Sequence, residues 1–194
     1  RKVEAAVAAV QKSVEECVRN SARLAAPTGC ASFQLKFGAS TLHRIFGIPV
    51  GFCGPVKARD SERFRKTKTQ MQQSRLFVID EMSMVGRQML GKIEFKVRDV
   101  LREPTRLNGE EVFLAGRDAV LCGDPKQANP IGDEPMYREG EYSGKGMNKP
   151  RGSQETPGDA WSTKYLARTG MRVRNPFQDA AFLRQVHRFE DTNE

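Results

Sequence analysis

One stretch of nine residues, at positions 76–84, constrains the fold more than any other part of the sequence. Four apolar residues (Leu76–Ile79) run directly into two adjacent carboxylates, Asp80 and Glu81. Such a run predicts a strand buried on both faces, which is typical of a parallel sheet in an α/β fold. Ligands of these folds bind at the carboxyl ends of the strands, where the two acids fall. An Asp-Glu pair there suits nucleotide hydrolysis, because one carboxylate can hold Mg²⁺ while the other activates water. The alternative is a strand that ends in two solvated acids.

The composition bounds the class of protein. The 194 residues suffice for one domain and part of a second, and no apolar run approaches the roughly 20 residues of a membrane span. The net charge of +8 favours a polyanionic partner. The four cysteines have no metal-ligand spacing, which indicates reduced thiols. We therefore expect a protein without a membrane segment that is not secreted, and that is nuclear or mitochondrial in a eukaryote and otherwise cytoplasmic.

Periodicity and turn residues place further elements around this strand. Valines at helical spacing predict an amphipathic helix over residues 3–18. A strand at residues 23–26 and a helix at 30–36 follow, and a loop at 38–43 enters a short helix that Ser40 or Thr41 caps. A helix follows residue 85, and residues 118–124 form another strand that ends in an acid. This alternation predicts an α/β fold with a doubly wound parallel sheet. The basic run at 57–75 is either a solvated face or a nucleic-acid surface.

Three pieces of sequence carry a resemblance to a known family. They are Ala-Pro-Thr-Gly-Cys-Ala at 26–31 with Gly-Ala-Ser-Thr-Leu-His at 38–43, Val-Ile-Asp-Glu-Met-Ser-Met at 78–84, and Leu-Cys-Gly-Asp-Pro-Lys-Gln-Ala-Asn-Pro-Ile at 121–131. Their order and spacing resemble the PIF-type (petite integration frequency) DNA helicases of superfamily one, including relatives in rolling-circle transposons. The resemblance implies a partial RecA-like P-loop NTPase motor domain at residues 1–131. An irregular loop or insertion at 132–160 and a join toward a second motor domain at 161–194 would follow.

The resemblance also implies roles for single residues. Asp80 would bind the nucleotide through its Mg²⁺. Glu81 would also belong to the nucleotide site and would activate water. Gly123, Asp124 and Gln127 would form a further part of the ATP site, in which the glutamine amide senses the γ-phosphate. The residues that would touch single-stranded DNA, through phosphates or by stacking on a base, are Pro27, Thr28, Gly29, Thr41 and His43.

A weaker match lies near the end of the chain. Leu183 followed by Arg188 resembles the motif Leu-x-x-x-x-Arg, whose arginine reaches the γ-phosphate from the cleft between two motor domains. Arg188 would then be catalytic. The alternative is a surface arginine near a frayed end, because residues 171–189 depart from the family elsewhere.

One motif that ATP hydrolysis needs is missing from the sequence. No Gly-x-x-x-x-Gly-Lys-Ser/Thr loop is present to cradle the phosphates. We expect the chain to begin just after that loop and to be part of a monomeric, ATP-dependent helicase that translocates on single-stranded DNA and unwinds duplex or forked DNA. The family implies telomere maintenance, repair, recombination or transposon replication. The alternatives are a truncated, non-catalytic remnant that at most binds DNA, and a RecD-like or conjugative-relaxase motor.

Overall fold

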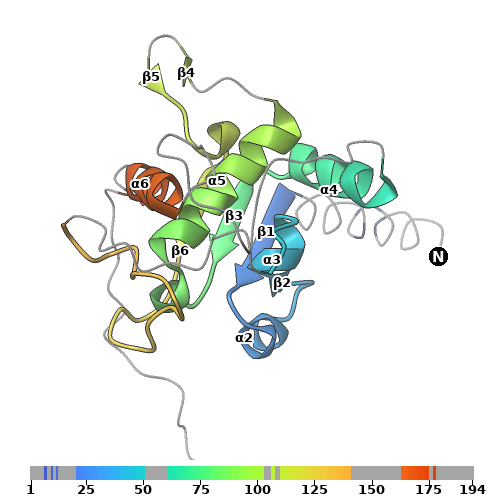
Figure 1. Cartoon of the computed structure of the whole chain (residues 1–194). Coiled ribbons are helices and arrows are strands. Elements are labelled where there is room, and N and C mark those ends of the chain that lie inside the picture. Colours follow the sequence, from blue (N-terminus) through green and yellow to red (C-terminus); the bar gives the residue numbers. More distant parts are fainter. Residues whose placement is uncertain are drawn as a thin grey trace, which may run out of the picture.

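The centre of the molecule is a four-stranded parallel sheet (Figure 1). The computed structural model describes residues 21–50, 61–102, 106–107, 110–140 and 163–174, together with Val7, Val10, Lys12 and Phe177. The sheet has the order β2-β1-β3-β6, and all three neighbouring pairs are parallel. Its strands are β1 (Ala22–Ala26), β2 (Ser40–Thr41), β3 (Leu76–Ile79) and β6 (Asp118–Leu121). The prediction of an α/β fold with a parallel sheet is confirmed.

Helices and short turns connect these strands. The α-helices are α2 (Gly29–Gln34), α3 (Leu42–Ile45), α4 (Glu62–Gln73), α5 (Arg87–Leu101) and α6 (Thr163–Arg174). Two 3₁₀ turns, η1 (Met82–Met84) and η2 (Leu114–Gly116), lie directly after β3 and before β6. A small antiparallel pair, β4 (Arg106–Leu107) with β5 (Glu110–Glu111), stands apart from the main sheet (Figure 1).

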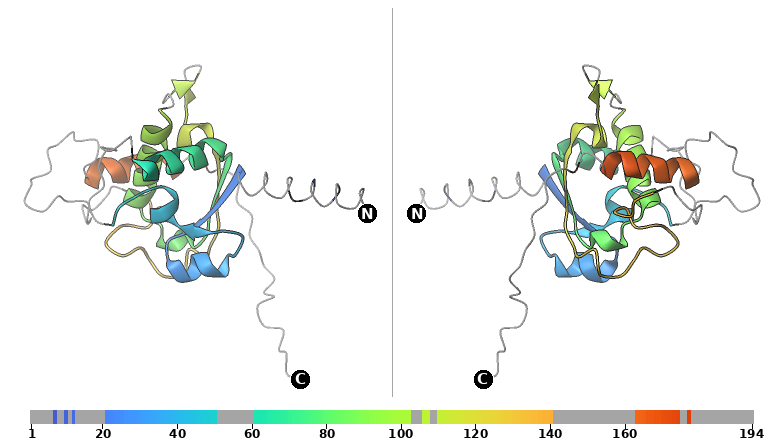
Figure 2. Two further views of the ribbon diagram at one scale, coloured as in Figure 1. Left: turned by 90° about the vertical axis from the view of Figure 1, so that its right-hand side faces the viewer. Right: turned by 90° about the vertical axis from the view of Figure 1, so that its left-hand side faces the viewer.

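The hydrophobic core lies on one face of the sheet. Phe77 and Ile79 of β3 are buried there with residues of α3, α4 and α5, and the ring centroids of Phe46 and Phe77 are 5.0 Å apart. Leu76 and Val78 on the opposite face are only half-buried. The expectation that this strand is buried on both faces is therefore wrong. The described helices α3, α4 and α5 cover the same face, so β3 alternates instead of being buried throughout (Figure 2).

The helix α6 forms a further layer on the outer side of α5 (Figure 2). Glycines let the two backbones approach closely. A Cβ atom at Gly91 would overlap the carbonyl oxygen of Leu166, and one at Gly170 would overlap the carbonyl oxygen of Arg87. Because no side chain separates the helices at these points, α5 and α6 pack as one unit.

Other sequence-based expectations fall partly outside the described residues. In the predicted helix at 3–18, Val7, Val10 and Lys12 are helical, and the rest lies outside them. The described part of the predicted loop, 132–140, contains no helix or strand apart from an isolated bridge between Gly86 and Pro135. Even so, Glu134 and Met136 in this segment are buried. None of the helices in the described ranges has the length and apolar character that a bilayer crossing requires.

Candidate nucleotide and nucleic-acid site

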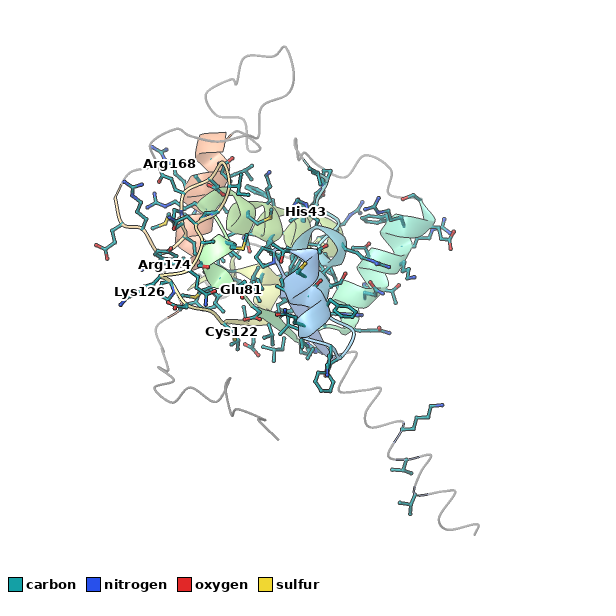
Figure 3. All side chains as sticks on the ribbon, turned by 90° about the horizontal axis from the view of Figure 1, so that it is seen from below. His43, Glu81, Cys122, Lys126, Arg168 and Arg174 are labelled. Atoms are coloured by element: carbon teal, nitrogen blue, oxygen red, sulfur yellow. The ribbon has the colours of Figure 1, made fainter. Side chains whose placement is uncertain are left out.

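Most of the predicted site residues lie at one edge of the sheet. The strands β1, β2, β3 and β6 are parallel, so their carboxyl ends meet at the same edge. Seen toward this edge, in Figure 3, Glu81 and Cys122 lie beside α2, and Lys126 lies farther to the left, beyond them. The chain segments that leave the strand ends carry Thr28, Asp80 and Asp124. The fold thus brings together three motifs that are far apart in the sequence.

Asp80 and Glu81 leave β3 with a sharp change of backbone direction. The backbone N–H of Asp80 donates to the carbonyl of Ala25 at 2.9 Å, which ties Asp80 to the end of β1. Glu81 then adopts a left-handed conformation with φ 54° and ψ 48°. This conformation is uncommon for a residue with a side chain and is frequent at functional sites. Both carboxylates are partly accessible, and neither bonds to any of the described residues.

Gly123 places the segment after β6 directly against the Asp-Glu turn. Its φ is +138°, and an added Cβ would lie 2.7 Å from the backbone nitrogen of Met82 and 3.2 Å from Cα of Glu81. The N–H of Met82 donates to the carbonyl of Cys122 at 2.8 Å. Only glycine fits this approach, so the predicted importance of Gly123 has a geometric reason.

The pKa of the Cys122 thiol depends on the same surroundings. Burial raises its pKa, and the negative charge of Asp80 raises this pKa further. The thiol therefore stays protonated at neutral pH and is a weak nucleophile.

The turn after Gly123 presents Gln127 to solvent. The side-chain carboxylate of Asp124 accepts from the N–H of Lys126 at 2.9 Å. The backbone carbonyl of Asp124 accepts from the N–H of Gln127 at 3.1 Å. One Asp124 oxygen therefore shapes the turn, a role for which asparagine and aspartate are suited. The side chain of Gln127 is exposed, as a residue that contacts a ligand must be.

The Pro27-Thr28-Gly29 turn begins α2. The Oγ1 of Thr28 accepts from the N–H of Ala31 at 3.2 Å, so Thr28 is the N-cap of the helix. This bond uses a lone pair of the hydroxyl and leaves its proton free to donate. Nothing lies within 4 Å of a Cβ placed on Gly29, so packing does not require glycine there. The open space permits a ligand to approach the backbone closely.

The Thr41-Leu42-His43 segment likewise combines a helix cap with a side chain that can contact a ligand. Thr41 caps α3, and its Oγ1 accepts from the N–H of Arg44 at 3.4 Å. The Nδ1 of His43 lies 3.0 Å from the carbonyl oxygen of Ile48. A carbonyl only accepts, so Nδ1 carries the proton and Nε2 is the acceptor in the neutral ring. His43 in that form can stack on a base or accept a hydrogen bond, but it cannot donate through Nε2 to a phosphate.

Two adjacent carboxylates at this edge fit the ligands of a magnesium–nucleotide complex. No group of three or more His, Cys, Asp or Glu side chains within the described part of the chain could hold a metal. Mg²⁺ in nucleotide enzymes is bound by one or two carboxylates and by substrate phosphates, with water completing the shell. Asp80 and Glu81, which have no protein partner among the described residues, supply such carboxylates.

Local sequence patterns missed a cluster of charges just behind this edge. The carboxylate of Asp133 accepts from the N–H groups of Gln88 (2.8 Å), Met89 (3.2 Å) and Glu134 (2.8 Å), and from Nε2 of Gln88 (3.1 Å). Asp133 thereby caps α5, whose own N-cap is Gly86 and has no side chain. The glycine N-cap and the absence of an acid from the first turn leave α5 without a local cap, but they do not indicate which residue caps it.

Buried Arg87 completes this cluster. Its Nη1 lies 3.4 Å from a carboxylate oxygen of Glu134 and donates to the carbonyl of Gly140 at 3.0 Å, and Nη2 donates to the carbonyl of Arg138. The segment 133–140 is thus tied to the start of α5. We name this set of contacts, made by Asp133, Glu134 and Arg87, the α5 clasp.

Not every predicted site residue can be placed. Arg188 and Leu183 lie outside the described residues, so the role of Arg188 remains a prediction. The roles of the other site residues also remain predictions. Asp80, Glu81, Gly123, Gln127, Thr28 and Thr41 lie at the sheet edge or in the segments that leave it.

Comparison with known proteins identifies the class and then the family. The described parallel sheet, with polar side chains at its carboxyl edge, defines the class as an α/β domain that can bind a ligand at that edge. The family model described as PIF1-like helicase matches residues 7–140, more than half of the chain. The chain therefore belongs to the PIF1-like helicase family. This result favours a PIF1-type motor over the RecD-like or conjugative-relaxase alternative.

Solved structures of Pif1 helicases resemble parts of the chain. A Bacteroides Pif1 in complex with ADP-AlF3 and single-stranded DNA is 32% identical, with a TM-score of 0.45 over 57% of this chain and 24% of that one. A structure of two coordinating Pif1 helicases at forked duplex DNA is 27% identical, with a TM-score of 0.48 over 66% and 30%. Pif1 from Candida albicans is 25% identical, with a TM-score of 0.45 over 63% and 26%. No curated protein matches the sequence. The chain spans only 24–30% of the length of these helicases.

Proposed function

We propose that this chain is part of an ATP-dependent DNA helicase and supplies the carboxylate wall of its ATP site and part of its path for single-stranded DNA. The observation that carries the proposal is the meeting of three motifs at one sheet edge. The backbones of Glu81–Met82 and Cys122–Gly123 are in direct contact there.

The residues at this edge divide the proposed work. When bound, Mg²⁺ would neutralise charge on the phosphates, and Asp80 would hold it. Glu81 would orient the attacking water and accept its proton, for which an accessible carboxylate is suited. Gln127 would report the γ-phosphate to the DNA path, since its amide can both donate and accept.

The finer parts of the proposal concern a complete helicase. Coupled to a second motor domain, with Arg188 reaching the γ-phosphate, such a protein would move along single-stranded DNA and unwind duplex or forked DNA as a monomer. Roles in repair, recombination or telomere maintenance, in the nucleus or mitochondrion of a eukaryote or in the cytoplasm otherwise, belong to the same proposal. A non-catalytic remnant that binds DNA is the second candidate, because the 194 residues contain no phosphate-binding loop.

The ATPase activity of the 194-residue chain tests whether it is only part of an ATP site and cannot hydrolyse ATP efficiently by itself. We expect steady-state turnover with Mg²⁺ and single-stranded DNA to equal that of the matched variant Glu81→Gln, because the phosphates lack their loop of backbone amides. Glu81→Gln keeps the size of the side chain and removes its charge. Robust turnover that this variant abolishes would show that the chain is a complete ATPase.

A further inference from the structure

Two aromatic side chains between the predicted DNA-contacting residues 27–29 and 41–43 are exposed to solvent. Phe33, in α2, is 85% exposed, and Phe37, in the loop that follows, is 79% exposed. Rings of this size are normally buried, and neighbouring exposed ones mark a binding surface. In Figures 1 and 2, α2 lies at the bottom of the molecule, below the strand ends. The helix that carries Phe33 therefore lies at the same edge as the candidate site.

The backbone that carries Phe37 is held in an unfavourable conformation. Lys36 (φ 55°) and Phe37 (φ 45°) are both left-handed, and Gly38 (φ 74°) follows them. A left-handed conformation suits glycine but crowds the Cβ of other residues. Two hydrogen bonds close the turn, from the N–H of Lys36 to the carbonyl of Phe33 at 3.3 Å and from the N–H of Ala39 to the carbonyl of Lys36 at 2.8 Å. The fold thus maintains strain while it leaves an apolar ring in water, a combination that favours a binding role.

The charge of the surrounding segment indicates what kind of partner fits. Residues 21–50 include Arg23, Lys36 and Arg44 but no aspartate or glutamate. Lys36 and Arg44 are exposed. This segment has aromatic rings and cations but no carboxylate of its own, which matches a partner that has both flat apolar faces and negative charge. Single-stranded nucleic acid has both, whereas a duplex keeps its base faces stacked inside.

We propose that Phe33 and Phe37 stack on unpaired bases of single-stranded DNA, whose phosphates face Lys36 and Arg44. This inference rests on the proposed function, in which the neighbouring Thr28 and Thr41 loops contact the same strand. The strand would then be held by two separate contributions. The cations would give affinity that falls with salt, and the rings would give affinity that depends on the presence of bases.

Two DNA probes separate these contributions. One is a short fluorescent oligothymidylate, and the other is an abasic strand of equal length and charge. The full 194-residue chain should bind the oligothymidylate at least about tenfold more tightly than the abasic strand. The double variant Phe33→Ala/Phe37→Ala should lose this preference and keep its salt-dependent affinity for the abasic strand. Both rings are exposed, so the variant should fold normally, as circular dichroism can verify.

Matched variants make the test specific. Val50→Ala removes another exposed apolar side chain (89% exposed) and should leave the base preference unchanged. Phe33→Trp/Phe37→Trp should restore the preference for bases that the alanine variant loses. Lys36→Ala should lower the salt dependence of binding and leave the preference for bases unchanged. Equal binding of both probes by the unmodified chain would overturn stacking but not DNA binding. Binding of neither probe would overturn the DNA part of the proposed function as well. If the alanine variant keeps its base preference but changes self-association in sedimentation, the rings form a protein interface and the proposal is wrong.

Discussion

The α5 clasp and the carboxyl edge of the sheet use similar side chains in opposite ways. Arg87, Asp133 and Glu134 of the clasp bond to other parts of the protein, and Arg87 and Glu134 are buried. Asp80 and Glu81 at the edge are partly accessible and have no partner among the described residues. The difference teaches that partners, more than residue type, separate charges that hold the fold from charges available to a ligand.

Glu94 extends the pattern of the clasp to the middle of α5. It is fully buried, and its carboxylate accepts from the N–H of Leu114 at 2.6 Å and pairs with Arg98. Leu114 and Ala115 in η2 are both left-handed, with φ of 50° and 52°. Glu94 therefore anchors the strained turn that leads into β6, which ends at Cys122 and Gly123.

The largest effect on stability should come from removing this anchor. Glu94→Ala should lower the free energy of unfolding by about 3–5 kcal/mol, because it leaves Arg98 and the buried N–H of Leu114 without their carboxylate. Urea denaturation followed by circular dichroism measures the change. The exposed Glu139→Ala is the control and should shift the free energy by less than about 0.5 kcal/mol. A loss below about 1 kcal/mol for Glu94→Ala would mean that the buried charge is not structural.

A smaller effect should follow from removing the remote cap. Asp133→Ala should cost about 1–2 kcal/mol, as the loss of a helix cap does. Burial raises the pKa of Asp133, although its hydrogen bonds to Glu134, Gln88 and Met89 oppose the shift. Folding therefore favours the protonated carboxyl, and stability decreases as the pH rises from the unfolded value of 3.8 through the folded pKa.

The neutral variant Asp133→Asn isolates this pH dependence. The stability of the unmodified chain relative to the variant should decline across that pH interval, since of the two side chains compared at position 133 only the aspartate can ionise. Urea titrations at several pH values, together with a carboxyl NMR titration, measure it. A relative stability that rises with pH would show that the hydrogen bonds outweigh burial and that the pKa is lowered.

The smallest effect should appear at the carboxyl edge, and it should have the opposite sign. Glu81→Gly relieves a left-handed side chain and removes a carboxylate next to Asp80. We expect the free energy of unfolding to rise by up to about 1 kcal/mol. Thermal unfolding measures this change, with Glu81→Gln as the control that keeps the backbone strain. Destabilisation by glycine would place Glu81 among the structural charges and break the comparison.

Sequence reasoning located the edge but not the clasp, for a physical reason. β3, β6 and the caps Thr28 and Thr41 have local signals, because apolar runs and capping hydroxyls act over a few residues. The α5 clasp joins Gln88 to Asp133, which are 45 positions apart, so no local pattern reveals it. The one-sided burial of β3 was also hidden, because it depends on which face the helices cover.

The clasp has a consequence for the loop that carries Gln127. This loop is fixed at Asp124 by its turn and by the end of β6, and at Asp133 by the start of α5. A segment pinned at both ends samples few conformations, so little chain entropy remains to be lost when it closes on a ligand. The buried contacts behind the site would then lower the entropic cost of recognition in front of it, although they touch no ligand themselves.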